Sequence, residues 1–329
     1  MKPNIFEIAT SELTQDGFIT WLLQWAEPGN KKYDEKLNAC AIDFVKFLIN
    51  ENLEITSVEA GRQRDNIDIW AKINDKYLII IEDKTYTSEH SDQLERYKKA
   101  AMNWYKEKDL KMVYIYLKTV TESKYLIENI KSKGFNYINR SNLIDFFKNY
   151  NNIENNIYID FTEKITNLEV AEKAFETKKI QEWDWNCWIG FYSYLDSILA
   201  TDQFLDWKYV SNPAGGFLGI WWYFLDWKEY TVYLQIEQAD LCFKIGKVKE
   251  ENRKNARDEW YNILIAKAKE SNREEIRKPD RFGNGEWMTV AKVERKDWLG
   301  GDNEIIDKEK VVKKLKEYEE FLDQARISK

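Results

Sequence analysis

The first third of the chain changes from a helical to a strand-like spacing of its apolar residues. Residues 11–25 carry apolar side chains every three or four positions, and residues 34–50 repeat that pattern, which predicts two amphipathic helices. The apolar spacing then falls to two in three short β-branched segments, at residues 54–60, 67–73 and 77–81. Their polar connections, at 62–64 and 74–76, suit hairpins, so we predict a three-stranded antiparallel meander.

Helical and strand-like patterns alternate after this meander. The predicted order is helix, strand, helix, strand, helix, at residues 92–106, 112–117, 123–132, 135–138 and 141–148. Ser91 is placed to cap the first of these helices. A strand reached through a helix suggests a parallel crossover. We therefore predict a first domain at residues 1–150, an α/β structure whose mixed sheet is flanked by helices.

The second half of the chain differs from the first in composition and in predicted elements. An Asn-rich stretch and a polar helix at residues 161–179 form a predicted linker over residues 151–182. Ten of the 14 tryptophans follow it. The predicted elements are a helix, three strands, a helix, a strand and a helix, at residues 185–199, 216–225, 231–237, 242–247, 253–270, 286–294 and 307–325. The pattern predicts a second, Trp-rich α+β domain over residues 183–329.

The overall charge is negative. The 329 residues include 57 acidic and 50 basic side chains, for a net charge of -7, so a histone-like binder held by bulk positive charge is excluded. Residues 244–281 carry a local excess, with 12 basic against eight acidic side chains. Nucleic-acid binding by such a chain is expected to be weak, metal-assisted and salt-sensitive.

The cysteine, histidine and apolar content excludes several other kinds of protein and metal site. The three cysteines lie far apart with no CxxC pair, which fits neither a disulfide scaffold nor a zinc ribbon. The single histidine, His90, excludes a multi-histidine metal site. No segment approaches the roughly 20 apolar residues of a spanning helix, and the N-terminus lacks a leader pattern. We expect a cytoplasmic protein without a membrane segment.

A cluster of ionisable residues ends the third predicted strand. Three isoleucines precede Glu82, Asp83 and Lys84, and Glu82 and Lys84 share a face because side chains alternate along a strand. With a three-residue loop at 74–76, the numbers of cross-strand partners sum to 150. Asp68 then lies opposite Glu82, whereas a two-residue loop would turn Asp68 to the other face.

Two carboxylates and a lysine on one patch need a compensating charge, because neighbouring carboxylates repel each other. A divalent cation supplies it. Mg²⁺, or Mn²⁺ in its place, prefers carboxylate and substrate oxygens, activates water and neutralises phosphate. Lys84 is then suited to orient the attacking water or to stabilise the charged transition state. This cluster predicts phosphodiester hydrolysis.

The spacing of Asp68 from Glu82-x-Lys84 resembles the PD-(D/E)XK nuclease superfamily, which has a restriction-endonuclease-like fold. Gln93 and Tyr97, one helical turn apart, resemble the QxxxY motif of RecB-like members. Residues 6–16, FEIATSELTQD, resemble the N-terminus of bacterial PD-(D/E)XK_4-type proteins. Ile67 stands where the motif name has proline. The likeness covers about residues 1–150.

The resemblance implies a role for each matching residue. Asp68 and Glu82 are expected to be metal ligands, Glu12 a ligand or water-orienting acid, and Lys84 the catalytic lysine. Gln93 and Tyr97 would position the substrate or the lysine. The implied function is a metal-dependent nuclease acting on DNA, in phage defence or DNA repair.

Alternatives stand beside these predictions. An inactive nuclease fold that binds nucleic acid or protein is the competing hypothesis, with a protein partner or a second copy held by the C-terminal domain. Glu12 also suits a first helical turn by its charge alone. His90 is either a phosphate contact or a solvated turn residue. Two further groups are either nucleic-acid contacts or ordinary structural residues: the basic set Arg62, Arg64, Arg96, Lys98 and Lys99, and the aromatic set Trp221, Trp222 and Tyr223.

Overall fold

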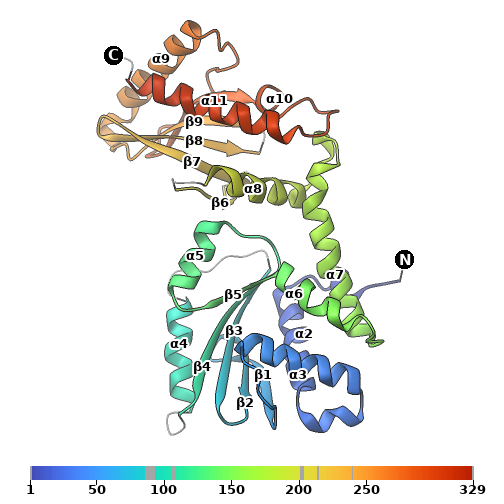
Figure 1. Cartoon of the computed structure of the whole chain (residues 1–329). Helices are drawn as coiled ribbons and strands as arrows, with labels where there is room; N and C mark the ends of the chain where they lie inside the picture. Colours follow the sequence, from blue (N-terminus) through green and yellow to red (C-terminus); the bar gives the residue numbers. More distant parts are fainter. Residues whose placement is uncertain are drawn as a thin grey trace. The chain divides into compact units, whose positions relative to one another are not determined.

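The computed structural model describes residues 2–85, 93–105, 109–200, 204–212, 215–238 and 240–327. The chain forms two compact units, shown in Figure 1. Unit 1 comprises Met1–Thr121 and Leu126–Val170, and unit 2 comprises Glu122–Tyr125 and Ala171–Lys329. Residues 151–170 of the predicted linker belong to unit 1, while the boundaries of independently folding domains stay a prediction.

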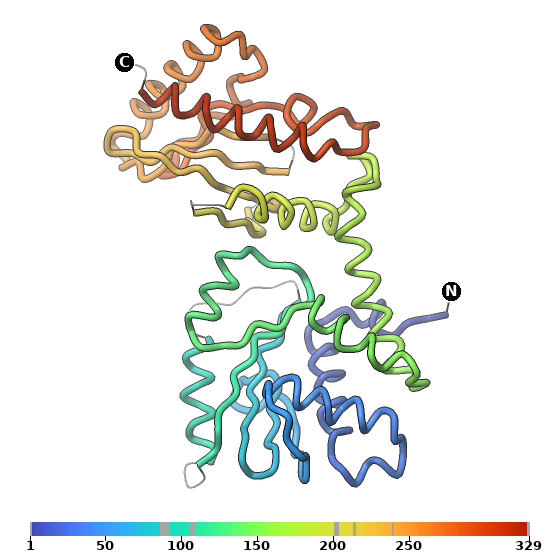
Figure 2. Tube along the Cα trace, viewed as in Figure 1, coloured from blue at the N-terminus to red at the C-terminus, as the bar shows by residue number. Residues whose placement is uncertain are grey.

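Unit 1 contains a five-stranded mixed sheet in the order β1-β2-β3-β4-β5. Its strands are β1 (Val58–Arg64), β2 (Ile67–Ile73), β3 (Tyr77–Lys84), β4 (Lys111–Lys118) and β5 (Asn136–Asn139). The first three pair antiparallel, and β4 pairs parallel to both β3 and β5. The predicted meander and parallel crossover are therefore confirmed, and Figure 2 shows the path of the chain through them.

Helices cover both faces of this sheet (Figure 1). They are α1 (Ile5–Ile8), α2 (Glu12–Trp25), α3 (Glu35–Ile49), α4 (Gln93–Trp104), α5 (Lys124–Ser132), α6 (Arg140–Phe147) and α7 (Asn156–Lys173). Helices α2, α3, α6 and α7 pack on the face that carries Ile79 and Ile81. Helix α4 packs on the opposite face, against Leu78 and Ile80. This alternation explains the continuous apolar run of β3, because a strand covered on both faces is buried at every position.

Several element boundaries in unit 1 differ from the prediction. Strand β1 begins at Val58 rather than at residue 54, because the side-chain oxygen of Asn74 accepts the N–H groups of Thr56 and Ser57. The predicted connection at 62–64 belongs to β1, and the turn lies at Asp65 and Asn66, both with positive φ. Helix α7 starts five residues early, because Asn155 accepts from the N–H groups of its first turn.

Unit 2 is an antiparallel sheet in the order β10-β9-β8-β7-β6, with helices. Its strands are β6 (Asp206–Val210), β7 (Phe217–Trp227), β8 (Tyr230–Glu237), β9 (Asp240–Gly246) and β10 (Met288–Glu294). Its helices are α8 (Trp185–Leu199), α9 (Arg253–Glu270), α10 (Arg295–Trp298) and α11 (Lys308–Ile327). Short 3-10 helices occur in both units, at Pro28–Lys32, Lys148–Tyr150, Ala174–Glu176, Ile180–Glu182 and Glu250–Asn252. The α+β prediction is confirmed, although β6, a short edge strand with two charged residues, was not predicted.

The tryptophans of unit 2 serve mainly as core. Trp222 is 2% exposed, and its indole N–H donates to Glu319 of α11 at 2.7 Å. The register shifts between Trp222 and Leu225, and the intervening Tyr223 has a φ of 58°. This bulge directs Tyr223 toward α11 as well, where its hydroxyl bonds Asp323. The interpretation of these aromatics as a nucleic-acid stacking surface is wrong for Trp222, for which the core interpretation is confirmed, whereas Trp221 and Tyr223 are half-buried.

The three cysteines are buried and free. None of the described helices combines the length and the apolar character that crossing a membrane requires.

Helix α8 begins at a capping residue whose loss should be measurable. The Asp184 carboxylate accepts from the N–H of Cys187 at 3.0 Å, and this bond contributes to lowering its pKa, although burial acts to raise it. We expect Asp184→Ala to lower the free energy of unfolding of unit 2 by about 1 kcal/mol, whereas Asp184→Asn keeps most of it. Urea titration followed by tryptophan fluorescence measures both. Equal midpoints for wild type and Asp184→Ala would contradict this assignment.

Candidate active site

The charged end of β3 lies beside Asp68 of β2. Ile73 pairs with Tyr77 and Ile69 with Ile81, so the predicted sum of 150 is correct. Continued by one residue, this register puts Asp68 opposite Glu82. The backbone N–H of Asp83 donates to Asp68 Oδ2 at 3.1 Å. The structure thus brings together Asp68, Glu82 and Lys84 as the sequence predicts.

Lys84 lies between the two carboxylates. Its ammonium nitrogen is 3.8 Å from Asp68 Oδ2 and makes a closer ion pair with Glu82. All three side chains are largely buried, with Glu82 fully so. In such surroundings opposite charges act strongly on each other because little water screens them. The group forms a compact electrostatic unit.

Burial sets the protonation of this unit. Desolvation, followed by the nearby Asp68 charge, raises the pKa of Glu82 to about 8 even though Lys84 opposes the shift. Burial alone would lower the pKa of Lys84, but the charges of Glu82, Asp68 and Glu12 raise it overall. Lys84 therefore stays protonated near neutral pH and is suited to act as a fixed cation rather than as a base.

Glu12 reaches this site from the other side of the sheet. It lies in the first turn of α2, and its carboxylate accepts from the backbone N–H of Thr85 at 3.0 Å. Thr85 follows Lys84 directly, so Glu12 lies at the end of β3, and its charge acts on Lys84. Glu12 thus occupies a helix position that favours an acidic residue, and it also lies where the sequence predicts a metal ligand.

Gln93 and Tyr97 contribute from α4. The Gln93 amide donates to the Tyr97 hydroxyl at 2.7 Å. Burial, and then the charge of Glu82, raises the pKa of Tyr97, so the phenol stays neutral beside the carboxylate. All six predicted site residues belong to the end of the sheet at which β3 finishes.

A second group, beneath the motif, was missed by the sequence analysis. Asp83 is 1% exposed and contacts two consecutive residues of α2, Gln15 and Asp16. Burial and the neighbouring Asp16 carboxyl raise the pKa of Asp83. Burial also raises the pKa of Asp16 to about 6, against the effect of its bond to Asp83. The sequence signal was present, since three polar residues, Thr14, Gln15 and Asp16, interrupt the apolar pattern of the helix.

The predicted basic rim is only partly directed to solvent. Arg62 donates to the carbonyl of Leu13 at 2.8 Å. The Arg64 guanidinium lies 4.1 Å from the centre of the Trp104 ring, and Lys98 bonds Glu95. Arg96 and Lys99 are exposed on α4. His90, and with it the phosphate-contact hypothesis, lies outside the described residues.

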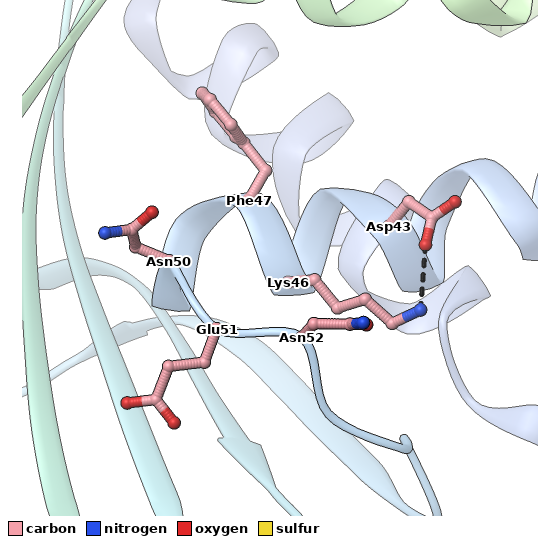
Figure 3. A pocket seen from close by; sticks show the side chains of 6 residues that line it. All are labelled: Asp43, Lys46, Phe47, Asn50, Glu51 and Asn52. Carbon is pink, nitrogen blue, oxygen red and sulfur yellow. Dashed lines mark hydrogen bonds and ion pairs between the residues drawn. The ribbon is translucent and has the colours of Figure 1, made fainter.

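One pocket of the structure is lined by none of the predicted site residues. A pocket of about 370 Å³ lies at the C-terminal end of α3, where Lys46 and Asp43 form an ion pair (Figure 3). Its lining residues are Asp43, Lys46, Phe47, Asn50, Glu51 and Asn52. The buried charges at the end of β3, rather than this pocket, mark the chemistry.

Comparison with known proteins agrees with this geometry. The family model described as the PD-(D/E)XK nuclease superfamily matches residues 3–174, a span that includes Glu12, Asp68, Glu82, Lys84 and the QxxxY pair. The chain belongs to the PD-(D/E)XK nuclease superfamily. No curated protein and no solved structure matches the chain. Superfamily membership suggests nuclease activity, the hydrolysis of nucleic acid, as the class of function.

The donor set of this PD-(D/E)XK site fits a hard divalent cation. Asp68, Glu82 and Glu12 offer only carboxylate oxygens, which Mg²⁺ and Mn²⁺ prefer. Both Glu82 oxygens are buried, and Oε1 pairs with the Lys84 ammonium. Across the described ranges, no three His, Cys, Asp or Glu side chains already stand in a metal-holding arrangement. Lys84 supplies the positive charge among the carboxylates.

Proposed function

We propose that the protein is a divalent-metal-dependent nuclease that hydrolyses phosphodiester bonds of DNA at the end of β3. The observation that carries this proposal is the convergence of Asp68, Glu82 and Lys84 in a member of the PD-(D/E)XK superfamily. Glu12, at the N–H of Thr85, completes the acidic set. Phage defence or DNA repair is the setting that the family suggests.

The residues of the site divide the work by charge. Asp68, Glu82 and Glu12 would hold Mg²⁺ or Mn²⁺, which when bound supplies a Lewis acid that offsets the negative charge of the phosphate. Lys84 keeps its proton and stabilises the negative charge that develops on the phosphate oxygens. Gln93 and the neutral Tyr97 hold hydrogen-bonding groups beside Glu82 and orient the substrate or the lysine.

Cleavage assays test the proposal directly. Wild type with Mg²⁺ or Mn²⁺ is expected to cut labelled single- or double-stranded DNA, and Asp68→Ala is expected to lose at least about 10²-fold in rate, as for loss of one electrostatic catalytic group. RNA of the same sequence tests the choice of nucleic acid. Equal cleavage by wild type and Asp68→Ala would refute the proposed site.

A binding protein with the same fold is the second candidate. It is favoured by the closed ion pair of Lys84 and Glu82 and by the lack of a preformed three-ligand cluster among the described residues. Calorimetry separates the two hypotheses, because only the nuclease requires Mn²⁺ uptake that depends on Asp68 and Glu82. A protein partner or second copy held by unit 2, and a cytoplasmic location, stay predictions.

A further inference from the structure

Asp83 is the middle residue of the Glu82-Asp83-Lys84 motif, yet its side chain points away from both neighbours. Successive strand residues alternate between the faces of the sheet, so Asp83 lies on the face that carries Ile79 and Ile81. It is 1% exposed there, among the apolar residues that pack against α2 and α3. Burying a carboxyl group costs free energy unless hydrogen bonds to other polar groups compensate it. The contacts of Asp83 therefore show what holds it in this position.

Gln15 supplies the principal contact. Its amide N–H donates to Asp83 Oδ1 at 2.5 Å, and its amide oxygen accepts from the Thr119 hydroxyl at 2.9 Å. Thr119 directly follows β4, and its own N–H donates to the carbonyl of Lys84 at 3.3 Å. One fully buried amide on α2 thus joins the ends of two adjacent parallel strands.

Asp16 extends the connection to β1. Its carboxyl lies against that of Asp83, and one of its oxygens accepts from Gln63 at 3.4 Å. Residues 12, 15 and 16 occupy one face of a helix, because three and four positions are close to one turn. The turn that carries Gln15 and Asp16 therefore sets the rotation and the height of Glu12.

The same network reaches the other acids. The backbone N–H of Asp83 donates to Asp68, and the Asp83 side chain accepts from Gln15. Lys84, the last residue of β3, and Thr85 follow Asp83 directly. The N–H of Thr85 holds Glu12. Two hydrogen bonds of α2, from Gln15 and Glu12, thus meet the chain at Asp83 and Thr85, on either side of Lys84.

We propose that Gln15 is a positioning residue, which locks α2 to the ends of β3 and β4 so that the Glu12 carboxylate is aligned with Asp68 and Glu82. This inference rests on the proposed metal-dependent function. Gln15 does not touch the metal or substrate in this role; it acts through Glu12. Groups that orient ligands in this way typically change metal affinity by about 10- to 100-fold when removed.

Mn²⁺ calorimetry on the full chain tests the role without an activity assay. Gln15→Ala is expected to weaken Mn²⁺ binding about tenfold. Gln24→Ala is the matched control, because Gln24 lies on the same helix and donates to the carbonyl of Ala60 at 3.0 Å, but is exposed. This control is expected to bind Mn²⁺ as wild type does.

A double-mutant cycle separates positioning from simple loss of packing. In a Glu12→Ala background, adding Gln15→Ala should change the Mn²⁺ affinity by less than about twofold, because coupled residues are not additive. Wild-type affinity in Gln15→Ala, or the same tenfold loss in the Glu12→Ala background, would overturn the inference alone. Absence of Mn²⁺ binding by wild type would overturn the proposed function and the inference together.

Thr119→Val keeps the test decisive if Gln15→Ala does not fold. Valine has the shape of threonine but lacks the hydroxyl that donates to Gln15. We expect it to weaken Mn²⁺ binding in the same direction, with the loss again disappearing in the Glu12→Ala background. Unchanged Mn²⁺ affinity in Thr119→Val would contradict the positioning role of Gln15.

Discussion

Lys84→Ala is expected to reduce DNA cleavage by at least about 10²–10³-fold, the usual loss when one group that stabilises transition-state charge is removed. The reason is geometric and electrostatic. The Lys84 ammonium is buried between Asp68 and Glu82, and the surrounding carboxylates keep its pKa raised. A cation held in this way costs little reorganisation when negative charge develops on a phosphate. The loss should appear in kcat rather than in KM.

Lys111→Ala is the matched control for this experiment. Lys111 also forms an ion pair with a glutamate, Glu51, but it is exposed at the opposite end of β4. Rates are measured on labelled DNA with saturating Mg²⁺, and circular dichroism verifies that both variants fold. Cleavage by Lys84→Ala within a few-fold of wild type would show that the buried lysine is structural.

Mn²⁺ is expected to stabilise the wild-type protein against unfolding, and Glu82→Gln is expected to abolish most of that effect. A ligand that binds only the folded state adds about 2.7 kcal/mol when its concentration is 100 times its Kd. Glu82 contributes two buried oxygens, one of which pairs with the Lys84 ammonium. Glutamine keeps the size of the side chain but replaces one carboxylate oxygen with an NH₂ group, whose partial positive charge repels a cation.

Thermal unfolding with and without Mn²⁺ measures this difference for each variant against its own metal-free form. Asp145→Asn is a suitable control, because Asp145 is an exposed carboxylate of unit 1 that pairs with Lys148. It should retain the full stabilisation. An equal Mn²⁺ effect in wild type and Glu82→Gln would remove Glu82 from the ligand set.

The placement of the motif residues was predictable because it depends on local rules. A three-residue loop at 74–76 determines which residues of β2 and β3 face each other, and strand alternation then brings Asp68, Glu82 and Lys84 to one face. Periodicity also predicted α8 and α9 with their observed limits. These features depend on residues that lie close to each other in the sequence, within one helix or one hairpin.

Features decided by distant partners were not predictable in the same way. Strand β6 is short and carries two charged residues, and its strand conformation depends on pairing with β7 at the edge of the sheet. The start of β1 depends on Asn74, 16 to 18 positions further along the chain. The side chain of Asp83 gives no local sign of its partner, because Gln15 lies 68 positions earlier.

The sequence by itself therefore determined the kind of chemistry, through the acids and the lysine that register and alternation gather at the end of β3. Only the tertiary structure decided how α2 is docked on the sheet, with Gln15 held between Asp83 and Thr119 and Glu12 at Thr85. The physical reason is that register follows from backbone hydrogen bonding between neighbouring segments. The docking of a helix on a sheet follows instead from side-chain packing among residues far apart in the chain.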